Sequence, residues 1–272
     1  MTLCFVSCKD KDLVANEEDQ AISFYNQIGF VNEEITDHLD YVFAASELLD
    51  SVKAGGNSDI VKNRYFYAAS DVQCVPANNA VNVTFGLYLN LTIEGDGTPL
   101  TKTGSKWVVS GQRHRVWSSS SDPETVSFTF IVTNNGSNYS MSGNIVTNNL
   151  YEYYYTSITA ALDFTVAKVT VYDSLTIGGG SDNRPVNQYT IDGEAYSMAN
   201  IQMVEKIKSL VSSCPYELVE GERVYVGTYF TGGTVNSTFS SGSEKLTLDI
   251  NYYPTYRTIT FKDNVYKYTL SN

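Results

Sequence analysis

The spacing of apolar residues changes once along this chain, and that change sets the strongest limit on its fold. In residues 33–53 apolar side chains recur at steps of three and four, which is the period of an α-helix. From about residue 60 the step becomes two, which is the period of a strand with one buried face. We therefore expect a mainly β protein, α+β overall, behind an α-helical N-terminal segment.

Two helices are predicted in the N-terminal segment, residues 16–56. The first covers residues 16–28, and the second covers residues 33–53 and ends at Gly55-Gly56. The apolar stripe of the second helix is formed by Ile35, Leu39, Val42, Ala45, Leu49 and Val52. His38 lies beside this stripe, and we interpret it as a surface or edge residue.

Residues 57–272 have the pattern of an antiparallel β domain. Apolar and polar side chains alternate over residues 81–89, 126–132 and 246–252. Asn135-Gly136 supplies a tight hairpin turn, since Asn and Gly tolerate the positive φ that such turns require. Strands at spacings of roughly 10 residues, joined by turn residues, indicate a sandwich or a curved meander.

Two segments interrupt this alternation. Residues 175–186 contain three consecutive glycines and a proline, so they are predicted to form a loop that could divide the β domain. Residues 197–212 carry apolar side chains at a helical spacing, and we predict one further helix there. These apolar positions are Ile201, Val204, Ile207 and Val211.

Composition limits the partners of the chain. The formal net charge is -12, and phosphate binding requires clustered cations, so nucleic acid is not an expected partner. The same charge argues against electrostatic binding to a membrane surface. Only two histidines are present and no Cys or His spacing is typical of zinc, so no metal or cofactor is expected. No stretch approaches the roughly 20 apolar residues of a transmembrane helix.

The first residues carry a processing motif. A short apolar run ends in Ser7, Cys8 follows it, and four charged residues come next. Over residues 5–19 the chain resembles the start of outer-membrane and surface lipoproteins of the Bacteroidetes. The resemblance implies that Cys8 carries a lipid and that residues 1–15 are a truncated signal, a lipobox and a charged tether. It also implies an exported protein held at the outer membrane or cell surface by that lipid alone.

Aromatic and basic side chains are the candidate ligand-binding residues. Arginines near tryptophans could bind a sulfated or carboxylated sugar, because a guanidinium pairs with such anions through two hydrogen bonds. The alternative is a strand whose tryptophans turn into the core. Tyrosine clusters suit recognition of sugars or protein surfaces, although strand packing explains part of them. The candidates are Trp107, Arg113, Arg115, Trp117, Tyr153, Tyr155, Tyr253 and Tyr256.

Cysteines and acidic residues leave alternatives open. Cys74 and Cys214 could form a disulfide in an oxidising compartment, or remain two separate buried thiols. Glycoside hydrolysis needs two facing carboxyl groups, and the sequence singles out no such pair. The scattered carboxylates are Glu94, Asp96, Asp163, Asp173, Asp192, Glu194 and Asp249.

The expected function is binding of a glycan or a protein by a non-catalytic β domain at the cell surface. The sequence contains no convergent catalytic set, so an enzyme is the less favoured class. A structural subunit of a larger assembly, such as a virion, tail or fimbria, is the first alternative. A carboxylate-dependent glycoside hydrolase is the second.

Overall fold

The computed structural model describes most of the chain after its first residues. The described residues are 13–55, 72–77, 79–85, 89–115, 124–150, 155–177, 180–198, 202–213, 216–219, 222–225, 229–241 and 243–269. Within them, no helix combines the length and the hydropathy that a membrane-spanning segment requires.

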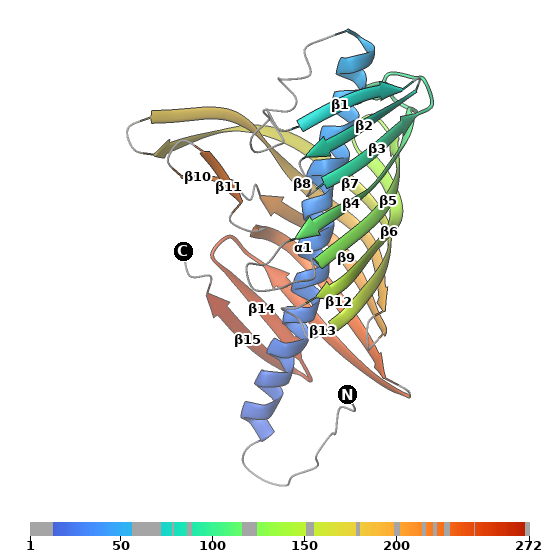
Figure 1. Cartoon of the computed structure of the whole chain (residues 1–272). Coiled ribbons are helices and arrows are strands. Elements are labelled where there is room, and N and C mark those ends of the chain that lie inside the picture. Colours follow the sequence, from blue (N-terminus) through green and yellow to red (C-terminus); the bar gives the residue numbers. More distant parts are fainter. Residues whose placement is uncertain are drawn as a thin grey trace.

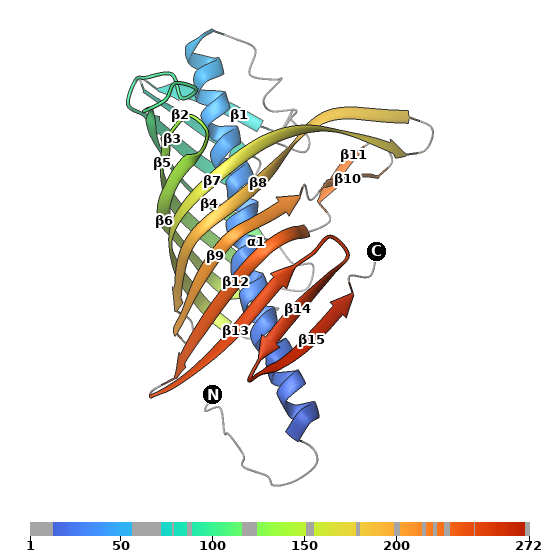
Figure 2. The same ribbon diagram turned by 180° about the vertical axis from the view of Figure 1, so that it is seen from behind.

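One long helix, a large curved sheet and a small two-stranded sheet form the described structure (Figure 1). Helix α1, Leu13–Lys53, lies along the concave side of the large sheet and crosses its strands, as Figure 2 shows from behind. The strands are β1 Val72–Ala77, β2 Ala80–Phe85, β3 Leu89–Gly95, β4 Lys106–Arg115, β5 Glu124–Asn134, β6 Tyr139–Leu150, β7 Tyr155–Ile177, β8 Gly180–Met198, β9 Gln202–Ser213, β10 Tyr216–Val219, β11 Glu222–Tyr225, β12 Tyr229–Ser241, β13 Glu244–Tyr252, β14 Tyr256–Phe261 and β15 Asn264–Thr269.

The large sheet is an antiparallel meander of 13 strands. Its order follows the sequence from β1 to β9 and then from β12 to β15, because β10 and β11 pair with each other in the small sheet. Mainly antiparallel β structure behind a helical N-terminal segment is therefore confirmed. Of the two arrangements expected from the sequence, the strand order is that of the curved meander.

The inner face of the sheet is apolar and packs against α1. One cross-strand row, with members opposite each other on neighbouring strands, crosses the sheet from β2 to β14. It comprises Val81, Ile93, Val109, Phe130, Gly143, Leu162, Ala195, Glu205, Ser237, Leu248 and Phe261. The ring of Phe24 in α1 lies 4.6 Å from that of Phe239 and 5.7 Å from that of Phe261. Burial of such apolar surface is the main force that holds a helix on a sheet.

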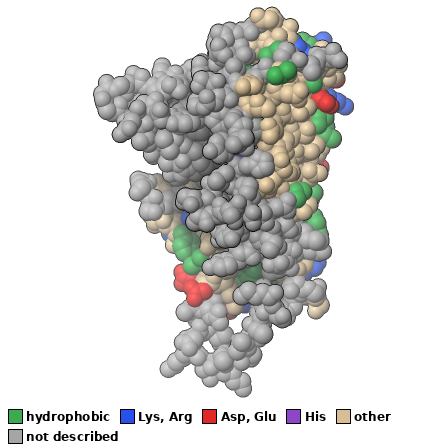
Figure 3. Space-filling model, in the orientation of Figure 1, with side chains coloured by type: hydrophobic (Ala, Val, Ile, Leu, Met, Phe, Trp, Pro, Cys, Tyr) green, Lys and Arg blue, Asp and Glu red, His purple; other side chains and the backbone are tan. Residues whose placement is uncertain are grey.

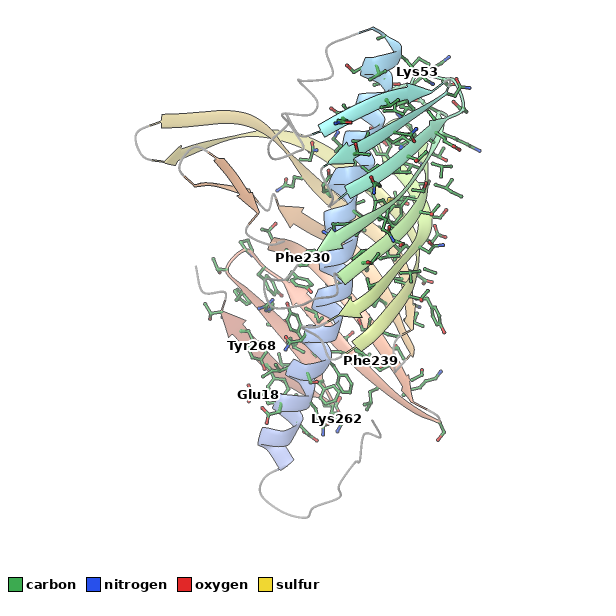
Figure 4. All side chains as sticks on the ribbon, in the orientation of Figure 1. Glu18, Lys53, Phe230, Phe239, Lys262 and Tyr268 are labelled. Carbon is green, nitrogen blue, oxygen red and sulfur yellow. The ribbon has the colours of Figure 1, made fainter. Side chains whose placement is uncertain are left out.

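Polar contacts fix the N-terminal half of α1 to the last strands of the sheet. Arg257 donates a hydrogen bond to the Tyr25 hydroxyl, and its guanidinium lies 4.5 Å from the centre of the Tyr25 ring. The Tyr268 hydroxyl donates to Glu18 over 3.2 Å. Figure 4 shows Glu18, Tyr268 and Lys262 at this end of the helix.

The C-terminal half of α1 is fixed to the first strands. The Asp50 carboxylate accepts hydrogen bonds from the backbone of Leu100 at 2.9 Å and Thr101 at 3.3 Å, which follow β3. In the same half of α1, the Lys168 ammonium from β7 lies 2.6 Å from the Glu47 carboxylate. Both halves of the helix are therefore held by polar contacts, to strands that are far apart in the sequence.

Two predictions about the helical segment need correction. The helices predicted at residues 16–28 and 33–53 are one continuous helix, which passes through Gly29. His38 is fully buried, and its ring meets that of Phe128 edge-on at 4.4 Å. Its place beside the apolar stripe made it look like an edge residue, but the curved sheet covers that side of the helix as well.

The helix predicted at residues 197–212 is wrong, because most of that segment is strand β9. Along β9, Met203, Glu205 and Ile207 are buried, while the residues between them are exposed. Glu205, an acidic residue at an inward position, interrupts the alternation of apolar and polar residues. The remaining apolar residues have a helical spacing, which explains the wrong prediction. Residues 175–186, predicted as a loop, belong to the far end of the β7–β8 hairpin.

Three glycines of the inner face lie directly opposite phenylalanines on the next strand. The pairs are Gly111 with Phe128, Phe130 with Gly143, and Phe164 with Gly193. A Cβ on Gly143 would lie 2.9 Å from the Phe130 ring and 2.0 Å from the Thr129 carbonyl oxygen. The missing side chain therefore lets the aromatic ring lie flat on the sheet, beneath the helix.

We expect Gly143→Ala to lower the free energy of unfolding by about 3 kcal/mol, because the new Cβ has no room between backbone and ring. Urea denaturation measures the loss. Ser142→Ala is the matched control, since Ser142 is the exposed neighbour on the same strand, and it should leave stability nearly unchanged. Equal stability of the two variants would contradict this account of the inner face.

Candidate functional site

An exposed stack of two tyrosines and a lysine lies at the turn between β13 and β14. The rings of Tyr253 and Tyr256 are 4.4 Å apart and inclined by 16°. The Lys267 ammonium, from β15, lies 4.1 Å from the centre of the Tyr256 ring. Tyr253 remains 38% exposed. We call Tyr253, Tyr256 and Lys267 the aromatic stack.

The local sequence explains this geometry. Ile259 and Phe261 point into the core, so by alternation Tyr256 and Thr258 point to the outer face of β14. The backbone N–H of Tyr253 donates to the Tyr256 carbonyl over 2.9 Å and closes the turn that contains Pro254. The turn thereby holds the two rings one above the other.

A short polar row borders the aromatic stack on the same face. Asn251, Thr258 and Lys267 lie opposite one another on β13, β14 and β15. The Asn251 amide donates to the Thr258 hydroxyl over 3.4 Å. The patch thus combines a flat apolar ring, amide and hydroxyl groups, and one cation.

The rest of the outer face is mostly uncharged and polar. One row that runs from β2 to β13 consists of Asn82, Thr92, Ser110, Thr129, Asn144, Ala161, Tyr196, Val204, Thr238 and Thr247. The described surface in Figure 3 is accordingly coloured mostly as uncharged polar side chains and backbone. Tyr196 is also exposed on this face, but no ring or cation contact is found for it among the described residues.

The structure separates the predicted binding residues. Tyr253 and Tyr256 are brought together, whereas Trp107 is only 2% exposed and its ring lies 6.0 Å from that of Tyr139. Burial therefore removes Trp107 from the predicted binding surface. Arg113 lies on the same, inner side of β4 and is half-buried, so it does not join an outer binding face.

Other predicted residues cannot be placed. Cys8, Trp117, Tyr153 and Cys214 lie outside the described residues. The side chains of Cys74, Arg115 and Tyr155 are outside the description as well, although their strands are described. The disulfide between Cys74 and Cys214 and the lipid on Cys8 therefore stay predictions.

A second unusual feature is the carboxyl group of Glu205, which is fully buried beneath α1 in the apolar inner row. The Ser237 hydroxyl donates to its Oε1 over 3.4 Å, and among the described residues its Oε2 has no hydrogen-bond partner. Burial raises the pKa of Glu205 to about 8, against a smaller lowering by the Ser237 hydrogen bond. The side chain is therefore mostly protonated at neutral pH.

Tyr252 and its neighbours extend this polar interior. Burial raises the pKa of the Tyr252 hydroxyl well above its ordinary value, and the nearby Tyr25 and Glu205 raise it further, while Arg257 opposes them. The sequence does not predict Glu205 as a buried residue, because the apolar side chains of residues 197–212 have a helical spacing. The available signal was the position of Glu205, which is two residues from both Met203 and Ile207. This is the spacing of side chains on one face of a strand.

The candidate carboxylates named from the sequence lie at exposed positions wherever their side chains are described. Within the described segments, no group of three or more His, Cys, Asp or Glu side chains is placed to hold a metal ion. Asp163 and Glu194 lie directly opposite each other on β7 and β8, both exposed on the outer face. Glu94, Asp96, Asp192 and Asp249 are exposed as well, and the side chain of Asp173 lies outside the description.

Comparison with known proteins adds no relative. No protein-family model, curated protein or solved structure matches the chain.

The buried Glu205 makes stability depend on pH. The unfolded chain releases the proton near pH 4.5 and the folded chain near pH 8, so between these values the folded state holds the proton more tightly. Stability should therefore fall as pH rises through this window, by at most about 5 kcal/mol, and then level off. Glu205→Gln should remove this fall in urea denaturation curves recorded from pH 4.5 to 9.

Glu194→Gln is the control for that experiment, because Glu194 is exposed on the neighbouring strand. It should retain the pH dependence of the unchanged protein. If the curves of Glu205→Gln and the unchanged protein run parallel over the whole window, Glu205 is not protonated in the folded state and its placement in the core is wrong.

Proposed function

We propose that the chain is an exported, non-catalytic binding protein whose β domain recognises a saccharide at the aromatic stack. The exposed, parallel Tyr253–Tyr256 pair carries this proposal. A tyrosine ring offers a flat apolar face for the C–H groups of a sugar, and its two side-chain torsions make ordering inexpensive in entropy.

Preorganisation strengthens the case for Tyr253. Its ring is supported from one side by Tyr256, and Lys267 supports Tyr256 in turn. A ring that is already fixed loses little freedom when a ligand binds, so more of the contact energy appears as affinity. The amide and hydroxyl groups of Asn251 and Thr258 beside the stack can bind sugar hydroxyls.

Attachment to the cell surface through a lipid on Cys8 belongs to the same proposal. Helix α1 begins at Leu13, five positions after Cys8 in the sequence, and its first turns lie at one end of the sheet (Figure 1). A lipid at Cys8 would keep the β domain close to the membrane while the outer face of the sheet stays accessible to ligands.

Binding without turnover fits the positions of the carboxyl groups. Glycoside hydrolysis uses two acids that flank a bound sugar. Asp163 and Glu194 lie side by side on an open face, on strands remote in the sheet order from the aromatic stack. Glu205 is fully buried and cannot reach a substrate.

A structural subunit is the second candidate, and one observation favours it. Val265 is 66% exposed on β15, the last strand of the sheet, and among the described strands β15 pairs with β14 alone. Exposed edge strands are common sites of association between chains. Sedimentation that shows a stable oligomer, which Val265→Lys converts to monomer, would favour this candidate over saccharide binding.

We expect Tyr253→Ala to weaken binding to an oligosaccharide found by glycan-array screening about ten-fold, since an aromatic contact contributes roughly 1–1.5 kcal/mol. Calorimetric titration measures the change. Tyr196→Ala is the control, because it removes an equally exposed tyrosine elsewhere on the outer face. Absence of any saccharide ligand, or equal affinities of the two variants, would refute the proposal.

A further inference from the structure

We infer that the saccharide is an acidic oligosaccharide, with one sugar on Tyr253 and a carboxylate on a separate sugar unit bound by Lys267. This inference rests on the proposed function and names the ligand class of the same site. It follows from the order of the three side chains in the aromatic stack and from the charges around them.

The order of the stack separates the cation from the free ring face. One face of Tyr256 is covered by Tyr253 at 4.4 Å, and the ammonium of Lys267 lies 4.1 Å from the centre of the same ring. Tyr253 follows β13 and Lys267 belongs to β15, and these strands lie on opposite sides of β14, so the two side chains flank the Tyr256 ring. The thickness of two rings lies between the ammonium and the outer face of Tyr253.

That separation excludes a single sugar as the full ligand. One pyranose ring that lies on Tyr253 cannot also place its own carboxylate on Lys267. An oligosaccharide that runs along the edge of the stack can reach both groups with different units. The polar row of Asn251, Thr258 and Lys267 lies beside that path and offers partners for hydroxyl groups.

The charges around Lys267 leave its ammonium available for an anion. Lys267 is exposed, and among the described residues it forms no ion pair. Asp249, which points to the same outer face from β13, is hydrogen-bonded by the Asn236 amide. The residue in line with Asp249 on β15 is Val265 and not a second acid. Although the chain has a net charge of -12, the surface around Lys267 is therefore a local site where an anion meets a cation.

Contact with Tyr256 also holds the ammonium in place. A lysine over an aromatic ring keeps its charge while its long side chain is restrained. Binding a carboxylate then costs less side-chain entropy than it would for a freely moving lysine. The attraction is exposed to solvent, so salt should weaken it.

The test compares three probes by calorimetric titration: a galacturonic acid trimer, the galactose trimer of the same linkage, and the galacturonic acid monomer. We expect the acidic trimer to bind roughly ten-fold more tightly than the neutral trimer at low salt, in the range of a charge-assisted contact. The acidic monomer should bind no more tightly than the neutral trimer. Raising the salt to 0.5 M should remove most of the preference.

Variants identify the cation. Lys267→Gln should abolish the preference for the acidic trimer over the neutral trimer, whereas Lys267→Arg should retain this preference. Lys245→Gln is the matched control, because Lys245 is exposed at the far end of β13. Tyr253→Ala should weaken both trimers alike.

The outcomes separate this inference from the proposed function. Equal binding of the two trimers, with both lost in Tyr253→Ala, would overturn the inference and leave saccharide binding intact. A preference that survives in Lys267→Gln would also overturn it. If neither trimer binds and the array shows no other saccharide ligand, the proposed function itself fails.

Discussion

Burial of α1 against the concave face of the sheet is the interaction on which the rest of the structure depends. A sheet with one apolar face must cover that face, and here a single helix covers it from the last strands to the first. Leu39 and Leu49 are fully buried in this contact, and Phe24 packs on rings of β12 and β14. Because α1 covers the inner face, the outer face is free to be polar and accessible.

The curvature of the sheet lets one helix pack against many of its strands. The glycines opposite Phe128, Phe130 and Phe164 allow these rings to lie close to the backbone of the next strand. The rings can then fill the space beneath α1 without pushing the sheet outward. Polar contacts at the two ends of α1, through Asp50 and Tyr25, fix the position of the helix along this surface.

The sequence predicts the elements better than it predicts their contacts. The helical spacing of residues 33–53 and the alternation after residue 60 both correspond to observed elements, and the hairpin at Asn135-Gly136 joins β5 to β6 with Gly136 at φ 97°. Local patterns suffice for such features, because they depend on neighbouring residues. The helix prediction for residues 197–212 is wrong because the inward position held by Glu205 is acidic. The spacing of apolar residues alone cannot predict a buried acidic residue.

The candidate site shows the same division. Tyr253 and Tyr256 are three residues apart around Pro254, so their proximity could be read from the sequence. Lys267 comes from another strand, and only the register of β14 with β15 brings it over the Tyr256 ring. Trp107 illustrates the opposite error, since its strand places it inward and the sequence could not say which face was buried.

Burial of Glu205 affects the pH at which the protein is most stable. A buried carboxyl group remains compatible with an apolar row only while it is protonated, because the charged form would lose its hydration. Carboxylates held ionised by hydrogen bonds act in the opposite sense; the backbone of Thr98 lowers the pKa of Asp96, for example. Glu205 therefore contributes most to stability under mildly acidic conditions. Asp96 loses its contribution in strong acid, because its carboxylate becomes protonated. The contributions of these two groups are both favourable at a mildly acidic pH, where Glu205 is neutral and Asp96 is charged.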